Sequence, residues 1–258
     1  MNNIVFISVI KQTLIHNRFL NKRINFILYG AVIYILFKRG RLEMGIKSCG
    51  QIYLYGELHC EEKIMKRQLE LWYNHYHNEN LRYLFLEHCY CATEFLNIWM
   101  RSDSDDILEM LYEIALAPDF PYIKDFFRTI KKDCPETVFC STTPVYPPIG
   151  EKYLQYLEDN NKNDTDEYFQ AQEMMEKGKR LYKKYGGEWD DGYREKNIVE
   201  NFIRRFEKLN GESVMVIYGA MHIMIDPVEY FGDVPCLGYQ LKERYGEAVH
   251  FEDLSGII

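Results

Sequence analysis

Residues capable of acid–base chemistry follow three short apolar runs of this sequence. The first run leads into Gly56-Glu57-Leu58-His59, the second into Glu87-His88, and a later one into Gly219-Ala220-Met221-His222. Imidazole and carboxylate groups act as general bases and acids, and both also bind divalent metals. A glycine permits the tight turn that lifts the following side chains above the end of a strand. The two Gly-x-x-His turns and the glutamate between them therefore predict one polar site.

The apolar runs alternate with segments of helical periodicity, and this pattern predicts how the polar residues are positioned. Strands alternating with helices are typical of an α/β fold with a largely parallel or mixed sheet flanked by helices, and sites in such folds form at the carboxyl ends of the strands. The expected strands are residues 51–55, 82–86, 136–140, 213–218 and 248–251. The expected helices are residues 61–77, 93–100, 105–116, 121–132, 151–185 with a break near 160–164, 194–209 and 240–245.

Two details of these segments are specific enough to test. In the first helix, Met65, Leu69 and Trp72 fall at i, i+4 and i+7, which predicts its apolar face. Residues 141–150 contain three prolines and are predicted to form an extended loop.

The helix before the last turn carries three polar residues on one face. Arg194, Asn197 and Asn201 recur at i, i+3 and i+7. Arg194 either reaches the site, where it would stabilise a carboxylate or a developing oxyanion, or forms an ordinary surface salt bridge.

Cys89 and Cys91 lie beside Glu87-His88, but no recognisable third group orients a Cys-His nucleophile pair. Buried, inert thiols are the favoured interpretation of these two residues.

Four motifs, in this order along the chain, resemble a known superfamily. They are YGELH, RYLFLEH, YREKNIVENFI and VMVIYGAMH. Together they resemble the Tiki/TraB/erythromycin-esterase superfamily, including its ChaN-like haem-binding branch. The resemblance covers about residues 51–258, and its most specific parts are the paired Gly-x-x-His turns and the Arg-containing helix before the second one.

The resemblance implies an α/β fold whose site residues here are Glu57, His59, Glu87, Arg194 and His222. Members of this superfamily resemble metal-dependent peptidases, hydrolyse macrolide esters or bind haem. Two departures are visible. Relatives often carry Gly after the first His, where this chain has Cys60, and often carry an Asp and a His after the third strand, where this chain reads Ser141-Thr142-Thr143-Pro144.

Three functions remain open from the sequence. The leading one is a hydrolase of an ester or peptide bond in a small-molecule or peptide substrate, in which His59 or Glu57 activates water, His222 and Glu87 complete the site, and Arg194 stabilises negative charge. The alternatives are a protein that binds haem or another small ligand, and a catalytically degenerate member. The missing acid and His after Cys140 favour these alternatives, whereas the five retained residues favour the hydrolase.

The balance of charges in the predicted site indicates whether it binds a metal ion. Arg194 alone cannot neutralise both Glu57 and Glu87, so a divalent cation, manganese or zinc, is predicted on His59, Glu87 and His222. The alternative is a metal-free acid/base site.

The bulk composition excludes some partners. The formal net charge of −8 makes nucleic-acid binding an unfavoured function. The seven cysteines are odd in number and irregularly spaced, which indicates reduced thiols in a cytoplasmic protein.

The first 45 residues are expected to be an N-terminal extension of an α/β domain that spans residues 50–258. Residues 24–37 are uncharged but short, because a helix of this length spans about 21 Å whereas a bilayer core is about 30 Å thick. This run is a short membrane anchor, a helix packed on the domain, or part of an upstream translation that ends before Met44. Any membrane association is expected through it alone.

Overall fold

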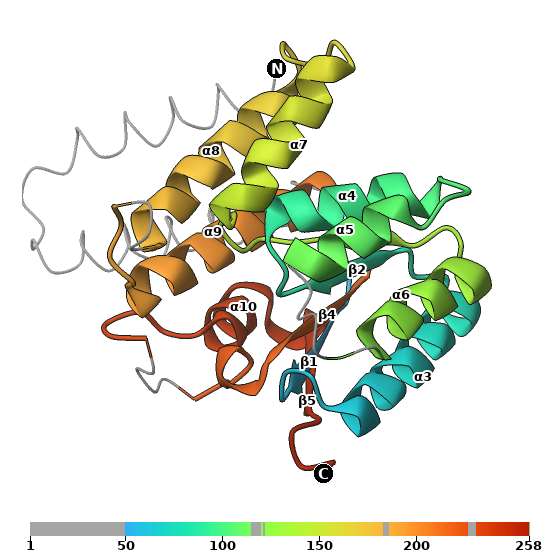
Figure 1. Cartoon of the computed structure of the whole chain (residues 1–258). Coiled ribbons are helices and arrows are strands. Elements are labelled where there is room, and N and C mark those ends of the chain that lie inside the picture. Colours follow the sequence, from blue (N-terminus) through green and yellow to red (C-terminus); the bar gives the residue numbers. More distant parts are fainter. Residues whose placement is uncertain (1–49, 115–119, 121, 183–185, 227–230, 258) are drawn as a thin grey trace, which may run out of the picture. The chain divides into compact units, whose positions relative to one another are not determined.

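A five-stranded sheet forms the centre of the computed structural model, which describes residues 50–257 apart from 115–119, 121, 183–185 and 227–230 (Figure 1). The described residues all belong to one compact unit. The predicted extension of residues 1–45, with the apolar run 24–37, lies outside the described residues. The strands are β1 (Ile52–Glu57), β2 (Tyr83–Leu86), β3 (Val138–Cys140), β4 (Val214–Gly219) and β5 (Val249–Asp253).

All the strand pairs of this sheet are parallel, and their order is β3-β2-β4-β1-β5. The prediction of an α/β fold with a largely parallel sheet is confirmed. Although β4 comes late in the sequence, it lies between β1 and β2 in the sheet. The carboxyl ends of β2, β4 and β1 are therefore adjacent, and these are the three strands that precede the candidate site residues.

Helices cover both faces of the sheet, as expected for parallel strands whose residues are buried on both sides (Figure 1). One face packs on α9 and α10, and Phe85, Val216 and Phe202 meet there. The opposite face packs on the helices from α3 to α8, with Leu84, Met215 and Trp72 among the buried residues. The helices are α3 (Glu62–Asn78), α4 (Tyr90–Met100), α5 (Asp106–Ile114), α6 (Tyr122–Asp133), α7 (Pro147–Asp159), α8 (Asp166–Leu181), α9 (Asp191–Lys208) and α10 (Leu237–Tyr245).

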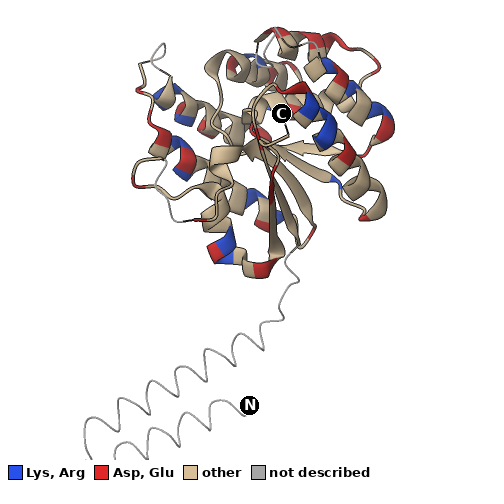
Figure 2. Ribbon diagram, turned by 90° about the horizontal axis from the view of Figure 1, so that it is seen from below, with Lys and Arg blue, Asp and Glu red and all other residues tan. Residues whose placement is uncertain are grey.

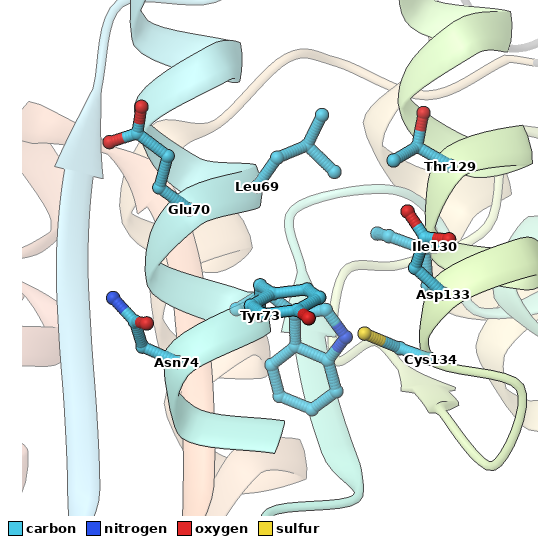
Figure 3. Close-up of a pocket in the computed structure, with 9 residues that line it drawn as sticks. Leu69, Glu70, Tyr73, Asn74, Thr129, Ile130, Asp133 and Cys134 are labelled. Atoms are coloured by element: carbon cyan, nitrogen blue, oxygen red, sulfur yellow. The ribbon is translucent and has the colours of Figure 1, made fainter. Parts of the chain in front are cut away.

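The apolar face predicted for α3 is wrong in part. Met65 and Leu69 are half-buried, whereas the sheet-facing side of the helix buries Ile64, Gln68 and His75. The physical reason is that two polar residues on this side meet polar partners on β1, so apolar character alone does not mark the buried face. Leu69 lines a hollow of about 380 Å³ between α3 and α6, where it and Tyr73 of α3 face Thr129, Asp133 and Cys134 (Figure 3).

The loop predicted for residues 141–150 is shorter than expected. Helix α7 begins at Pro147, so two prolines occupy its first positions. A proline is tolerated there because the first turn of a helix does not use its own N–H groups for intrahelical bonds.

Charged side chains lie mainly on the helices and loops around the sheet, whose strands are largely uncharged (Figure 2). Within the described part of the chain, no helix is both long and apolar enough to cross a membrane.

Candidate functional site

The first Gly-x-x-His turn forms a carboxylate–imidazole pair at the end of β1. Glu57 Oε1 lies 2.8 Å from His59 Nδ1, and the second carboxylate oxygen of Glu57 accepts a hydrogen bond from the Gln68 amide of α3. Gln68 is buried and holds Glu57 from the side of the core, whereas the His59 side chain is 57% exposed. A carboxylate on Nδ1 fixes the imidazole tautomer and leaves Nε2 for proton transfer.

The second turn forms a matching pair after β4. His222 Nδ1 lies 2.6 Å from Glu195 Oε2 of α9, and Glu195 Oε1 accepts the backbone N–H of Leu237 at 2.6 Å. Glu195 is fully buried, and the His222 side chain is 7% exposed. This pair is therefore a closed counterpart of the open Glu57–His59 pair.

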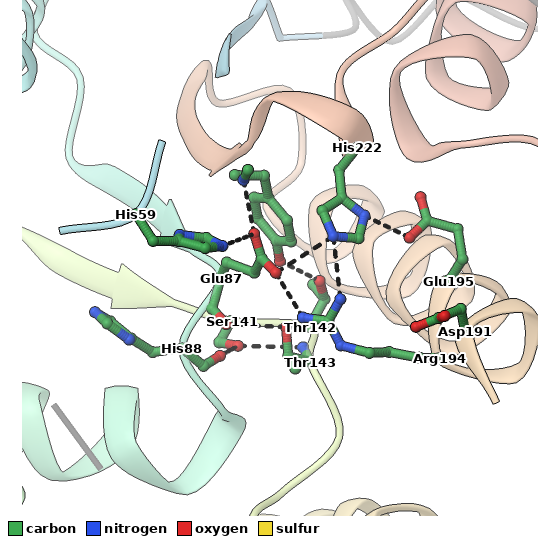
Figure 4. Close-up of polar contacts among 12 residues, drawn as sticks. His59, Glu87, His88, Ser141, Thr142, Thr143, Asp191, Arg194, Glu195 and His222 are labelled. Atoms are coloured by element: carbon green, nitrogen blue, oxygen red, sulfur yellow. Dashed lines mark hydrogen bonds and ion pairs between the residues drawn. The ribbon is translucent and has the colours of Figure 1, made fainter. Parts of the chain in front are cut away.

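Both imidazoles turn their Nε2 atoms toward one carboxylate, that of Glu87 at the end of β2 (Figure 4). His59 Nε2 lies 3.6 Å from Glu87 Oε2, and His222 Nε2 lies 3.3 Å from Oε1. Arg194 Nη2 donates to Oε1 at 2.6 Å, and the backbone N–H of Gly219 donates to Oε2 at 2.7 Å. The structure thus brings Glu57, His59, Glu87, Arg194 and His222 together at one sheet edge.

The charges of these groups are set by their contacts. Burial raises the pKa of Glu87, but the hydrogen bond with His222 and the positive charges of His222 and Arg194 outweigh it and hold this pKa well below its usual range. Burial lowers the pKa of His222, yet the hydrogen bonds to Glu195 and Glu87 raise it to about 9. This pKa favours the imidazolium form of His222 at neutral pH, in which the Nε2–H faces Glu87 and not Arg194. Arg194 Nη1, 3.0 Å from its Nε2, is a neighbouring cation, and Glu87 holds both.

His59 differs from His222 in its surroundings. The hydrogen bond to Glu57 raises the pKa of His59, burial lowers it, and the nearby Glu87 raises it again, so that the net direction is upward. Because its side chain is the most exposed of the five, His59 is the group that a substrate can reach.

Gly219 keeps the centre of the site open. A Cβ atom at this position would lie 3.2 Å from both Glu87 Oε2 and His59 Nε2. A side chain there would therefore enter the space where these two groups meet.

Residues 141–143 follow β3 and form the departure from the resembled superfamily that the sequence shows. The Ser141 hydroxyl donates to the His88 carbonyl, the Thr143 hydroxyl donates to the Glu87 carbonyl at 3.3 Å, and Thr142 is hydrogen-bonded to the Tyr218 hydroxyl (Figure 4). Asn201 of α9 in turn donates to the Thr142 carbonyl at 2.9 Å. This segment therefore supports the backbone of Glu87-His88 and adds no titratable group to the site.

The other departure, Cys60, adopts a backbone conformation that glycine takes more easily. Its φ of 61° lies in the left-handed region that favours glycine. The Tyr122 hydroxyl of α6 donates to the Cys60 carbonyl and ties this turn to α6.

The cysteines beside Glu87 do not form a reactive nucleophile. Burial raises the pKa of Cys89 and that of Cys91, which keeps both as thiols. The six cysteines that the structure describes are all free.

The residues predicted to ligate a metal do not fit one as they are arranged. His222 Nε2 and Glu87 Oε1 are both within 3.0 Å of Arg194, so a divalent cation on these atoms would lie against the guanidinium. Across the described residues, no group of three or more His, Cys, Asp or Glu side chains is placed to hold a metal ion.

Two residues of the site were not predicted from the sequence, Gln68 and Glu195. Glu195 has a signal: it lies at i−3 and i−7 from Ile198 and Phe202, so a charged residue continues the buried stripe of α9. Gln68 has none, because its helix was assigned a different buried face.

Comparison with known proteins gives similarity of fold. No family model matches the chain, and no curated protein matches its sequence. A mutant of the erythromycin esterase EreC in its open conformation is similar, with a TM-score of 0.55, 12% identity and coverage of 84% of this chain and 72% of that one. A Bacillus cereus protein has a TM-score of 0.54 and 11% identity, with coverage of 80% of this chain and 66% of that one. At these identities the likeness establishes the fold alone.

Proposed function

We propose that this chain hydrolyses an ester bond without a metal, with His59 as the base that activates water. The observation that carries the proposal is the convergence of two Glu–His pairs on Glu87, one open to solvent and one buried beside Arg194. The similarity of fold to an erythromycin esterase supports the choice of an ester. Membership of the Tiki/TraB/erythromycin-esterase superfamily is part of the same proposal.

The proposed reaction uses the proton positions set by the two pairs. Glu57 accepts the Nδ1–H of His59, so Nε2 takes a proton from a water molecule that also donates to Glu87. The water oxygen attacks the carbonyl carbon of the ester, the C–O bond to the alcohol breaks, and the leaving alkoxide takes the proton from His59. The products are a carboxylic acid and an alcohol.

Arg194 and His222 supply the positive charge. They lie on the side of Glu87 away from His59 and hold Glu87 as an anion. Their field also favours the negative charge that develops on the carbonyl oxygen. Glu195 acts through His222, which it keeps protonated and oriented.

A substrate panel with the purified full chain tests this function against its alternatives. We expect hydrolysis of 4-nitrophenyl acetate and butyrate after chelation, no cleavage of unmodified peptides, and no Soret absorbance on addition of haemin. Peptide cleavage without ester cleavage, or a stoichiometric haem spectrum, would overturn the proposal in favour of the peptidase or the haem-binding function.

A further inference from the structure

A cavity opens beside His59, between the ends of β1 and β2 and helices α3 and α6. Its volume is about 240 Å³, and Glu57, His59 and Glu87 lie at its polar end. Five apolar side chains make up most of its other walls, those of Met65, Leu86, Ile123, Phe126 and Ile217, and Cys60, Gln68 and His88 complete the lining. All but Met65 of these five side chains are buried, so the cavity is a formed recess of the core.

We propose that this cavity receives the acyl group of the ester, and that this group is apolar, uncharged and at most about eight carbons long. This inference rests on the proposed function, since it assigns the substrate class of the same site. The two carboxylates at the polar end disfavour an anionic group, and the five apolar side chains favour an apolar one, since the Gln68 amide nitrogen already donates to Glu57. At about 30 Å³ for each water-sized group, the cavity holds on the order of eight such groups.

The geometry also distinguishes the acyl group from the alcohol. The leaving alcohol takes its proton from His59, whose exposed side opens to solvent. Arg194 and His222, which favour the charge on the carbonyl oxygen, are not among the described residues that line the cavity. The acyl group therefore occupies the apolar recess, and the alcohol departs outward.

Chain-length dependence of hydrolysis tests the assignment. Burying one methylene corresponds to about a fourfold gain in binding, so kcat/KM for 4-nitrophenyl butyrate is expected to exceed that for the acetate on the order of tenfold. The gain should stop once the chain is longer than the cavity. In the Met65→Trp variant, whose indole fills the recess, the preference for butyrate should disappear.

Leu69→Trp is the matched control, because Leu69 lies one turn further on the same helix, is also half-buried, and lines the separate hollow of Figure 3. It should keep the wild-type preference. Butyl acetate and ethyl acetate form the second arm, and equal rates for these two are expected because the alcohol lies outside. Equal rates along the acyl series, or a preference carried by the alcohol series, would overturn the assignment.

A binding measurement separates this inference from the proposed hydrolysis. In protein labelled with [13C-methyl]methionine, hexan-1-ol is expected to shift the Met65 methyl signal, identified by its absence in Met65→Trp, in both wild type and Leu69→Trp. Ester hydrolysis without this shift would overturn the cavity assignment and leave the function standing. The shift without hydrolysis of any ester would overturn the function while the cavity still binds the apolar group.

Discussion

Replacing Glu195 by Gln removes the buried negative charge that holds His222 as an imidazolium. Glu195 is fully buried and contacts His222 Nδ1 at 2.6 Å, and the amide keeps nearly the same shape. A Gln oxygen can still accept the Leu237 N–H, so the substitution changes the charge more than the packing. The expected result is a lower pKa of His222.

The magnitude follows from linkage. The folded-state pKa of His222, about 9, lies above the ordinary value of 6.5. The stability that this difference contributes is fully present below about pH 6.5 and is lost as the pH rises through about 9. At 1.36 kcal/mol for each pKa unit, it amounts to about 3 kcal/mol. Because Glu87 still raises the pKa of His222 in the Glu195→Gln variant, wild type should lose more stability than this variant between pH 6 and pH 10 by a part of this figure.

Urea unfolding at the two pH values measures this difference. Glu200→Gln is the control, because Glu200 is an exposed residue of the same helix and other groups that titrate in this range are common to all three proteins. The pH dependence is the diagnostic quantity, since removing a buried carboxylate also removes its desolvation cost. Identical losses in wild type and Glu195→Gln, or an NMR titration of His222 with a midpoint at or below 6.5, would refute the reasoning.

Three further outcomes follow from the site. The raised pKa of His59 and the pKa of about 9 of His222 predict a bell-shaped pH profile, because His59 must be neutral and His222 charged for the reaction. The value of kcat/KM should rise with pH through a midpoint above 6.5 and fall again near pH 9. A profile that is flat from pH 5 to 10 would contradict this prediction. Gln68→Met removes the buried donor to Glu57 and should lower kcat about tenfold with little change in KM, as stopped assays on a substrate series would show; an unchanged kcat would remove Gln68 from the positioning of Glu57. In calorimetry with zinc and manganese, wild type and the double variant His59→Ala, His222→Ala should behave alike, because these histidines hold no metal. Metal binding by wild type that the double variant loses would restore the predicted metal site.

The sequence was sufficient to locate the strands and the turns that follow them. The apolar runs before Glu57, Glu87 and His222 mark β1, β2 and β4 to within about two residues, because parallel strands buried on both faces are nearly continuous in apolar character. The glycines at the two turns then indicated where side chains leave the sheet.

The order of the strands and the partners of the site residues could not be read in this way. Nothing local to residues 214–219 shows that β4 lies between β1 and β2, although this placement is what brings His222 to Glu87. The roles of Gln68 and Arg194 likewise depend on which strand each helix packs against. The metal prediction assumed two carboxylates with one cation, whereas Glu195 and the raised pKa of His222 change that balance.

The most direct test of the account is the effect of removing the His59 imidazole on hydrolysis by the chelated full chain. His59→Gln should lower kcat/KM for 4-nitrophenyl butyrate by about 10²- to 10⁴-fold, the range expected for loss of a general base. His77→Gln, which replaces an exposed histidine near the end of α3, should leave the rate unchanged. Equal activity of His59→Gln and His77→Gln would contradict the assignment of His59 as the base that activates water.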